Sequence, residues 1–279
     1  MSLIGTMGSG VSALRTFMKG LEVIGDNIAN VNTTGYKASQ VAYADSFSNI
    51  LQRSSPSSAT AGNSPSVGIG TGVQLAGINT NFGQGSLAST GNGTDLGISG
   101  NGFFNVKNVV DSTHYATRAG MFRWDDQGFL VTTQGYRVQG LTGAGLTGTG
   151  DIKLATPPTG TERQSATIDR TGGVVEFYSD GTSVTTNQVL IQNFTDPSAL
   201  VREGNSLYSG MLAAGPAAAS APGTNGLGNI QAGTLELSNV DLTDQFANLI
   251  TTQRSFQAAS RLVTVSDTVL EDIVSLKQR

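Results

Sequence analysis

The chain of 279 residues lacks cysteine altogether and contains one histidine and one tryptophan. The absence of cysteine excludes disulfides, thiolate nucleophiles, zinc–thiolate sites and iron–sulfur clusters. A single histidine, His114, excludes any metal site that needs several histidines. Since these gaps remove most catalytic and metal-binding chemistry, we expect no enzyme activity, no cofactor and no bound metal.

Charged residues and long apolar runs are also scarce. Lys, Arg, Asp and Glu make up 13% of the chain, against about 25% in a typical soluble domain, and the net charge is −4. This balance predicts no basic surface for phosphates, so we expect no nucleic acid as a partner. Apolar runs of only a few residues predict no membrane insertion. No basic residue precedes Arg15 and no continuous apolar run lies near the start, so we expect no ordinary cleaved signal peptide.

The N-terminal part of the chain carries a heptad pattern. Apolar residues recur at intervals of four and three, and finally seven: Met7, Val11, Leu14, Met18, Leu21 and Ile28. This spacing predicts one helix from about Thr6 to Val31, with its apolar side chains on one seam. The following Asn32–Gly35 predicts a turn in which Gly35 takes a left-handed conformation.

The C-terminal part repeats the pattern over a greater length. Ser238 and Asp241 resemble a capping box that starts a helix. One seam then recurs along the helix at Leu242, Phe246, Leu249, Phe256, Val263, Leu270 and Val274. A second stripe consists of Ala259, Leu262, Val269, Ile273 and Leu276. Two apolar stripes on one long helix predict packing partners on two sides.

The middle of the chain has the pattern of β-strands and turns. Apolar runs such as Phe103–Val106 and Val174–Tyr178 alternate with turn signals, among them Asp125–Gly128. We therefore predict an α+β fold, in which long terminal helices pair as a coiled-coil-like inner domain beside a mostly antiparallel β middle domain. The expected boundaries are 1–37 plus 239–279 for the helical domain, 38–75 for an extended linker and 76–238 for the β-rich domain.

Three local patterns suggest sites but are better explained by local structure. Gly68–Gly72 lacks the lysine and the following helix of a phosphate-binding loop, so we interpret it as a turn. No Gly-x-Ser-x-Gly nucleophile motif accompanies His114. The pair Asp125–Asp126 fits a solvated turn and lacks the further oxygen ligands of a calcium loop. The heptads therefore carry most of the functional information, and by themselves they fit either an internal helical hairpin or packing between copies.

Several segments resemble the bacterial flagellar axial proteins, which are the rod and hook subunits of the flagellum. Residues 23–37 closely match their N-terminal motif Asn-Asn-(Ile/Leu)-Ala-Asn…Thr-x-Gly-(Phe/Tyr)-Lys, with Asp26 in place of the first asparagine. Residues 235–243 and 253–257 are similar to the matching C-terminal signature. Residues 96–104 and 115–122 resemble the core of the family's β domain. The resemblance thus touches both ends and the middle of the chain.

The resemblance implies a structural subunit that polymerises into a tube, with the terminal helices lining the tube and the β domain outside. Residues 238–243 and 43–47 look more like a hook subunit, which favours the hook that transmits torque between rod and filament. The interval 140–167 is too short for the outer domain of longer hook proteins, and a distal basal-body rod subunit is the alternative. A monomeric surface module that binds through its β domain is a further alternative.

The implied partners are other copies of the chain, adjacent rod and hook-junction proteins, the hook cap during assembly and the flagellar type III export apparatus. The implied location is the extracellular hook or the periplasmic-to-outer basal body. The residues expected to carry self-assembly are the helical seams and three signature positions: Met7, Val11, Leu14, Met18, Leu21, Asn27, Ile28, Asn30, Gly35, Leu242, Phe246, Leu249, Phe256, Leu262, Val263, Val269, Leu270 and Ile273.

Overall fold

The computed structural model describes residues 3–54, 56, 63–143, 146, 148–157 and 160–277. The chain forms two compact units, each discontinuous in sequence. The helical unit comprises Met1–Ala29, Ser39–Asn81 and Asp241–Arg279, and the β unit comprises Asn30–Ala38 and Phe82–Val240. Residues 1–2 and 278–279, which fall in the expected helical domain, lie outside the described residues.

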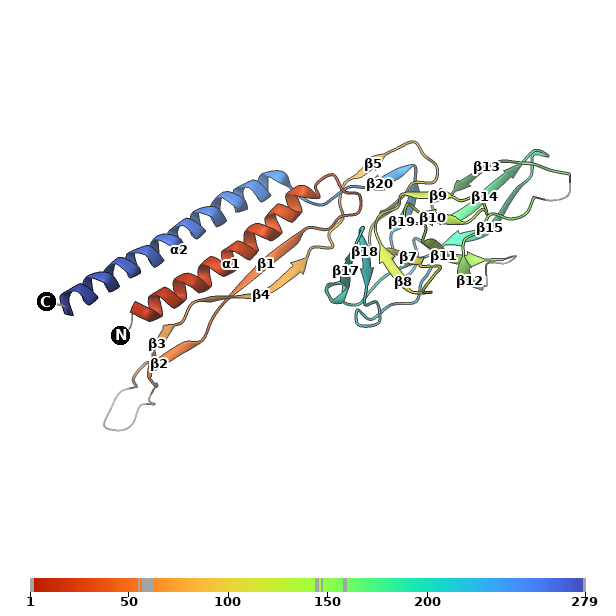
Figure 1. The fold of residues 1–279 in the computed structure, drawn as a ribbon. Helices are drawn as coiled ribbons and strands as arrows, with labels where there is room; N and C mark the ends of the chain where they lie inside the picture. Colours follow the sequence, from red (N-terminus) through yellow and green to blue (C-terminus); the bar gives the residue numbers. More distant parts are fainter. Residues whose placement is uncertain are drawn as a thin grey trace. The chain divides into compact units, whose positions relative to one another are not determined.

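The helical unit is built on two long helices that lie side by side (Figure 1). These are α1, Leu3–Ala29, and α2, Leu242–Lys277. Asp241 caps α2, because its Oδ1 accepts hydrogen bonds from two backbone N–H groups of the first turn, at 2.8 and 3.4 Å. Asp241 is therefore the cap itself, not the third helical residue that the expected Ser238 capping box requires. Neither helix of the described chain is long and apolar enough to cross a membrane.

Two antiparallel pairs of strands complete the helical unit. β1 (Ser39–Asp45) pairs with β4 (Val73–Thr80), and β2 (Ser48–Gln52) pairs with β3 (Val67–Gly70). β1 packs on α1, where the rings of Tyr43 and Phe17 meet edge to face with centroids 6.0 Å apart.

The unit boundaries differ from the expected ones in two places. Most of segment 38–75, expected as an extended linker, forms strands and clusters with the helices, while residues 55 and 57–62 lie outside the described part. The Asn30–Ala38 segment, most of it expected with the helices, belongs to the β unit. The physical reason is burial: Tyr36 and Lys37 are both covered there.

The β unit is built from antiparallel strands, and its largest sheet follows the order β13-β14-β15-β11-β7-β8-β18-β17. Four further strands of the same sheet lie outside this order: β10 and β12 pair with β11, β16 pairs with β7, and β9 pairs with β10. Two separate pairs, β6 with β19 and β5 with β20, join segments distant in sequence. The bounds are β5 (Leu87–Ser89), β6 (Leu96–Ser99), β7 (Phe103–Lys107), β8 (His114–Thr117), β9 (Phe122–Trp124), β10 (Leu130–Thr132), β11 (Arg137–Thr142), β12 (Gly148–Asp151), β13 (Arg163–Ile168), β14 (Gly173–Tyr178), β15 (Ser183–Val189), β16 (Ile191–Gln192), the 3-10 helix η1 (Pro197–Ala199), β17 (Val201–Gly204), β18 (Leu207–Ser209), β19 (Asn229–Ala232) and β20 (Thr234–Glu236).

The predicted α+β fold is confirmed, since terminal helices enclose a mainly antiparallel β middle in sequence. The predicted turn Asp125–Gly128 joins β9 to β10. Within it, Gly128 adopts a φ of +80°, a conformation that glycine reaches without steric cost.

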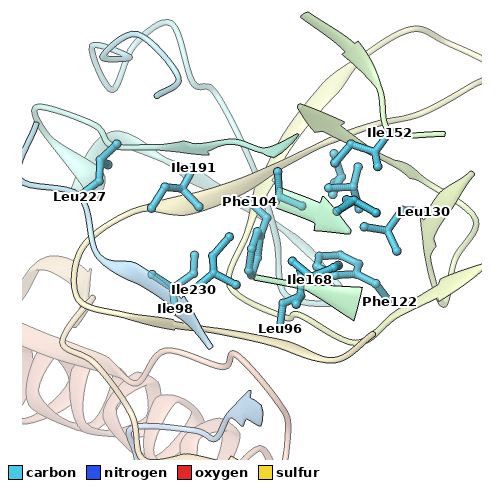
Figure 2. Close-up of a cluster of buried hydrophobic side chains, with 14 of the residues drawn as sticks. Leu96, Ile98, Phe104, Phe122, Leu130, Ile152, Ile168, Ile191, Leu227 and Ile230 are labelled. Carbon is cyan, nitrogen blue, oxygen red and sulfur yellow. The ribbon is translucent and has the colours of Figure 1, made fainter. Parts of the chain in front are cut away.

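The core of the β unit is a large cluster of buried aliphatic and aromatic side chains (Figure 2). Phe104 is fully buried there and meets Phe122 edge to face, with ring centroids 5.1 Å apart. A second buried cluster surrounds Phe103, whose ring contacts those of Phe194 and Tyr208. Successive residues of β7 thus supply two clusters, because side chains alternate between the faces of a strand.

We predict that Phe104→Ala destabilises the β unit by about 3–5 kcal/mol, because it removes a fully buried ring and leaves a cavity. Chemical denaturation followed by the fluorescence of Trp124, which packs against the same cluster, measures the loss. The matched control is Phe177→Ala, at a ring that is 40% exposed, which should cost much less. Equal losses for the two variants would contradict this account of the core.

Candidate assembly surfaces

The two helices of the helical unit run in opposite directions. The hydroxyl oxygens of Thr6 and Ser266 lie 3.4 Å apart near one end of the pair. At the other end, the Asn27 side-chain amide donates to the Gln245 Oε1 at 3.0 Å. Early residues of α1 therefore meet late residues of α2, which is the geometry of a helical hairpin.

Glycines allow α1 to approach its neighbours closely. A Cβ atom at Gly10 would meet the Val263 Cγ2 at 2.8 Å, which is closer than two carbon atoms pack. A Cβ at Gly20 would collide with the Tyr43 hydroxyl and would also contact Thr252. Both glycines are buried, so larger residues at these positions would push α1 away from α2 and β1.

The predicted seam residues divide between the inside and the outside of the helix pair. Those that the pair half-buries are Met7, Leu14, Leu21, Ile28, Leu249, Phe256, Val263 and Leu270. Those left exposed are Val11, Met18, Leu242, Phe246, Leu262, Val269 and Ile273. From Leu249 to Leu270 the regular heptad of α2 is thus half-buried within the chain. Leu242 at its start is exposed, as are the second-stripe residues Leu262, Val269 and Ile273.

One face of α2 presents a continuous apolar surface. Residues at helical spacing share this face, and we call them the α2 stripe: Leu262, Val265, Val269, Ile273 and Leu276. Their side chains are 40–73% exposed. Isolated exposed apolar residues are ordinary, but a row of five on one helix is typical of an interaction surface.

The β2–β3 pair is a second exposed apolar surface, and the sequence interpretation missed it. Phe47 is 85% exposed, and Ile50, Leu51, Val67 and Ile69 are about half exposed. This segment was expected as an extended linker with a turn at Gly68–Gly72, whereas Val67–Gly70 forms β3. The alternation of Val67, Gly68, Ile69 and Gly70 was the available strand signal.

Asn27, a predicted assembly residue, is occupied inside the helical unit. Its side chain is 2% exposed and bonds to both backbone polar groups of Ser39, donating to the carbonyl at 2.7 Å and accepting from the N–H at 2.9 Å. Together with the bond to Gln245, these contacts tie the end of α1 to the start of β1 and to α2. The side chain of Asn27 is therefore used for contacts within the helical unit.

The other two signature positions lie in the β unit. The Asn30 side-chain oxygen accepts from the Thr33 hydroxyl at 3.1 Å and thereby supports the turn. Gly35 has a φ of +67°, as predicted, and its N–H donates to the carbonyl of Glu236 at 2.8 Å. A Cβ at Gly35 would lie 2.5 Å from the backbone nitrogen of Ala119, so only glycine fits this turn.

A buried charge cluster follows the signature turn. The Lys37 Nζ and the Arg118 Nη1 lie 2.6 and 3.0 Å from the two carboxylate oxygens of Glu236. The Gly85 N–H donates to the same carboxylate at 2.9 Å, and Lys37 also donates to the carbonyl of Gly83. Burial lowers the pKa of Lys37 more than the adjoining carboxylate raises it. We call Lys37, Arg118 and Glu236 the buried triad.

Known proteins are similar to this chain along its whole length. The flagellar basal-body rod protein FlgG of Bacillus subtilis is 39% identical over 277 residues, covering 99% of this chain and 100% of that protein. The chain belongs to the flagellar rod and hook protein family. Axial proteins named FlgG from Agrobacterium fabrum and Caulobacter vibrioides are 33% and 32% identical, each over 96% of this chain and covering 96% and 100% of those proteins. The flagellar hook protein FlgE of Borreliella burgdorferi is 23% identical over 96% of this chain and 98% of that protein.

Three family models map onto the structural elements of this axial subunit. The flagella basal body rod model matches residues 7–37, which cover most of α1 and the signature turn. The model of the D1 domain of the flagellar hook protein FlgE/F/G matches residues 97–176 in the β unit. The C-terminal model of the flagellar basal body rod FlgEFG proteins matches residues 231–276, from β19 through α2. These are structural rather than enzymatic families, and all three residues of the buried triad fall within matched segments.

We predict that Glu236→Gln costs the β unit of this axial subunit about 3–5 kcal/mol, because Lys37 and Arg118 are then buried without a counter-charge. Thermal and denaturant unfolding measure the change. The matched control is Glu203→Gln at an exposed carboxylate, where unfolding should hardly change. A Glu236 variant as stable as the wild type would show that the buried triad does not hold the segment around Lys37 in the β unit.

Proposed function

We propose that this chain is a subunit of the flagellar basal-body rod and that it polymerises with its own copies there. The observation that carries the proposal is the full-length match to FlgG rod proteins, with 39% identity to the Bacillus subtilis protein over 99% of the chain. The relatives named FlgG align over lengths close to that of this chain, 255–282 residues. The hook relative aligns over 438 residues, which implies a large insertion in the hook protein.

The hook interpretation drawn from the sequence is less well supported. Its two favouring segments serve general roles, since Asp241 caps α2 and Tyr43 packs against α1. Neither role distinguishes a hook subunit from a rod subunit. Between β11 and β13, the described residues form β12 and connections, without an outer domain. This agrees with the short interval noted in the sequence.

The exposed apolar surfaces support polymerisation. The helix pair buries one set of seam residues internally, and the α2 stripe is left for a neighbour. A lone helix pair with such a stripe gains stability only when the stripe is covered, because burying an aliphatic side chain contributes about 1.5–3 kcal/mol. We propose copies of the chain as the principal cover, and adjacent rod and hook-junction proteins at the ends of the polymer.

Immunogold labelling of isolated hook–basal bodies tests the assignment. An antibody against this chain should label the rod and leave the hook unlabelled. Labelling along the hook would support the hook assignment instead. The absence of label from the whole structure would contradict both the rod and the hook assignment.

We predict that Ile273→Asp, on the α2 stripe, raises the critical concentration for assembly by orders of magnitude. Each copy would bury an unpaired carboxylate, at a cost of several kcal/mol per contact. Sedimentation of the polymer measures the effect, and circular dichroism checks that α2 still forms. Gln257→Asp, at an exposed polar position of the same helix, is the matched control and should assemble normally. Normal assembly of the Ile273 variant would exclude the stripe as a contact.

A further inference from the structure

A row of basic side chains crosses the main sheet of the β unit. The row runs over five neighbouring strands, in the order β9, β10, β11, β7 and β8. The residues that pair directly from each strand to the next are Arg123, Val131, Arg137, Lys107 and His114. Directly paired residues project from the same face of a sheet. We call the four basic positions the basic ladder, and it spans about 19 Å at 4.8 Å per strand.

The ladder places like charges in direct opposition. Arg137 faces Lys107, an arrangement that destabilises an antiparallel pair. One carboxylate compensates, because Asp151 accepts from the Arg137 Nη1 at 2.9 Å and from Gln139 at 2.7 Å. Burial raises the pKa of Asp151, but these two hydrogen bonds and the nearby cations outweigh it and lower the pKa. Burial and the charge of Lys107 both lower the pKa of His114.

A fifth basic residue extends the same surface. The Lys153 Nζ lies 4.8 Å from the centre of the Phe129 ring, and the Arg137 guanidinium lies 3.7 Å from it. The other basic residues of the β unit are held elsewhere: Lys37 and Arg118 by Glu236, Arg163 by Glu176, Arg202 by a backbone carbonyl, and Arg170 at the exposed β13–β14 turn. Basic side chains thus share one face of a unit whose sequence is acidic overall, with the exposed Asp111 and Asp126 in the adjoining β7–β8 and β9–β10 turns.

Two exposed carboxylates lie at the far end of the same sheet. Glu162 and Asp180 flank Ser179, whose N–H donates to the Glu162 carbonyl at 2.9 Å and whose hydroxyl accepts from the Glu162 N–H at 3.1 Å. Both carboxylate side chains are exposed, and we call them the acidic tip.

The strand register separates the tip from the ladder. Thr142 of β11 pairs with Asn187, and β15 continues beyond that pair towards Asp180, whereas Arg137 lies at the other end of β11. Roughly a dozen residues of extended chain, or about 40 Å, lie between Arg137 and Asp180.

We propose that the basic ladder of one copy contacts the acidic tip of the next copy in the polymer. This inference rests on the proposed function, since it assigns a contact within the rod. Opposite charges at opposite ends of one unit make a head-to-tail contact, which builds an open filament when the rotation between copies does not close a ring. Each copy carries a net charge of −4, so complementary patches would also offset repulsion between copies and orient their approach.

Charge reversal and its rescue test the contact. The ladder variant carries Lys107→Glu and Arg123→Glu, and the tip variant carries Glu162→Lys and Asp180→Asn. Asparagine keeps the oxygen that accepts from the Thr182 N–H in the turn. At low ionic strength, each variant should raise the critical concentration for assembly at least tenfold. A chain with all four changes should return to within about threefold of wild type, because the patches are again complementary.

Two further measurements separate assembly from folding. Lys107→Glu places a carboxylate opposite Arg137, so the monomer should melt no lower than wild type. Arg170→Glu reverses a charge outside both patches and is the matched control, with unchanged assembly expected.

Unchanged assembly of the ladder variant would overturn the contact. A combined variant no better than the ladder variant would also overturn it, because the ladder would then serve another partner, such as an acidic polymer. Failure of the wild-type chain to self-associate at any concentration would contradict the proposed function as well, whereas the first two outcomes would leave that function intact.

Discussion

The buried carboxylate of Glu236 is the interaction on which the β unit depends most. It receives Lys37 from the segment that follows α1 and Arg118 from the segment after β8, and Glu236 itself ends β20, the last strand before α2. A single acceptor therefore binds the entering and the departing stretches of the chain. Because either cation would be costly to bury alone, both stretches are docked together or not at all.

The helices present a different constraint, which is a surplus of apolar surface. α1 and α2 cover each other along one seam, and small residues such as Gly10 bring them close. The same helices carry further apolar residues on faces that the described chain leaves open. A monomer thus satisfies its heptads only in part. The internal hairpin and the packing between copies, which the sequence left as alternatives, are compatible in this arrangement.

Much of this architecture could be predicted from the sequence because periodicity is a local signal. The heptads predicted both helices, and alternating apolar runs with turn residues predicted the β middle and the Asp125–Gly128 hairpin. The position of Gly35 in a left-handed turn followed from its place after a helix. Division of the seam residues into covered and exposed sets could not be predicted, because it depends on which face of each helix meets the other.

Three other features could not be predicted from the sequence, each for a physical reason. Burial of Lys37 depends on Glu236, which lies 199 residues away, so no local pattern reveals it. The β2–β3 pair was concealed by a loop-like composition. The basic ladder was concealed by the net charge, because a sum over the chain contains no information about strand register. The register between β11 and β7, which are neighbours in the sheet but not consecutive in sequence, brings Arg137 and Lys107 together, and only the fold supplies it.

The docking of both chain segments in the β unit also has a kinetic consequence. Asn27 and Gln245 are 218 residues apart, and closing so long a loop directly is entropically costly and slow. Once the Gly35 N–H meets the Glu236 carbonyl, only a few residues separate each helix from this junction. A folded β unit therefore turns a contact of high sequence separation into an effectively short-range one. This topology favours an order in which the β unit folds before the two helices pair.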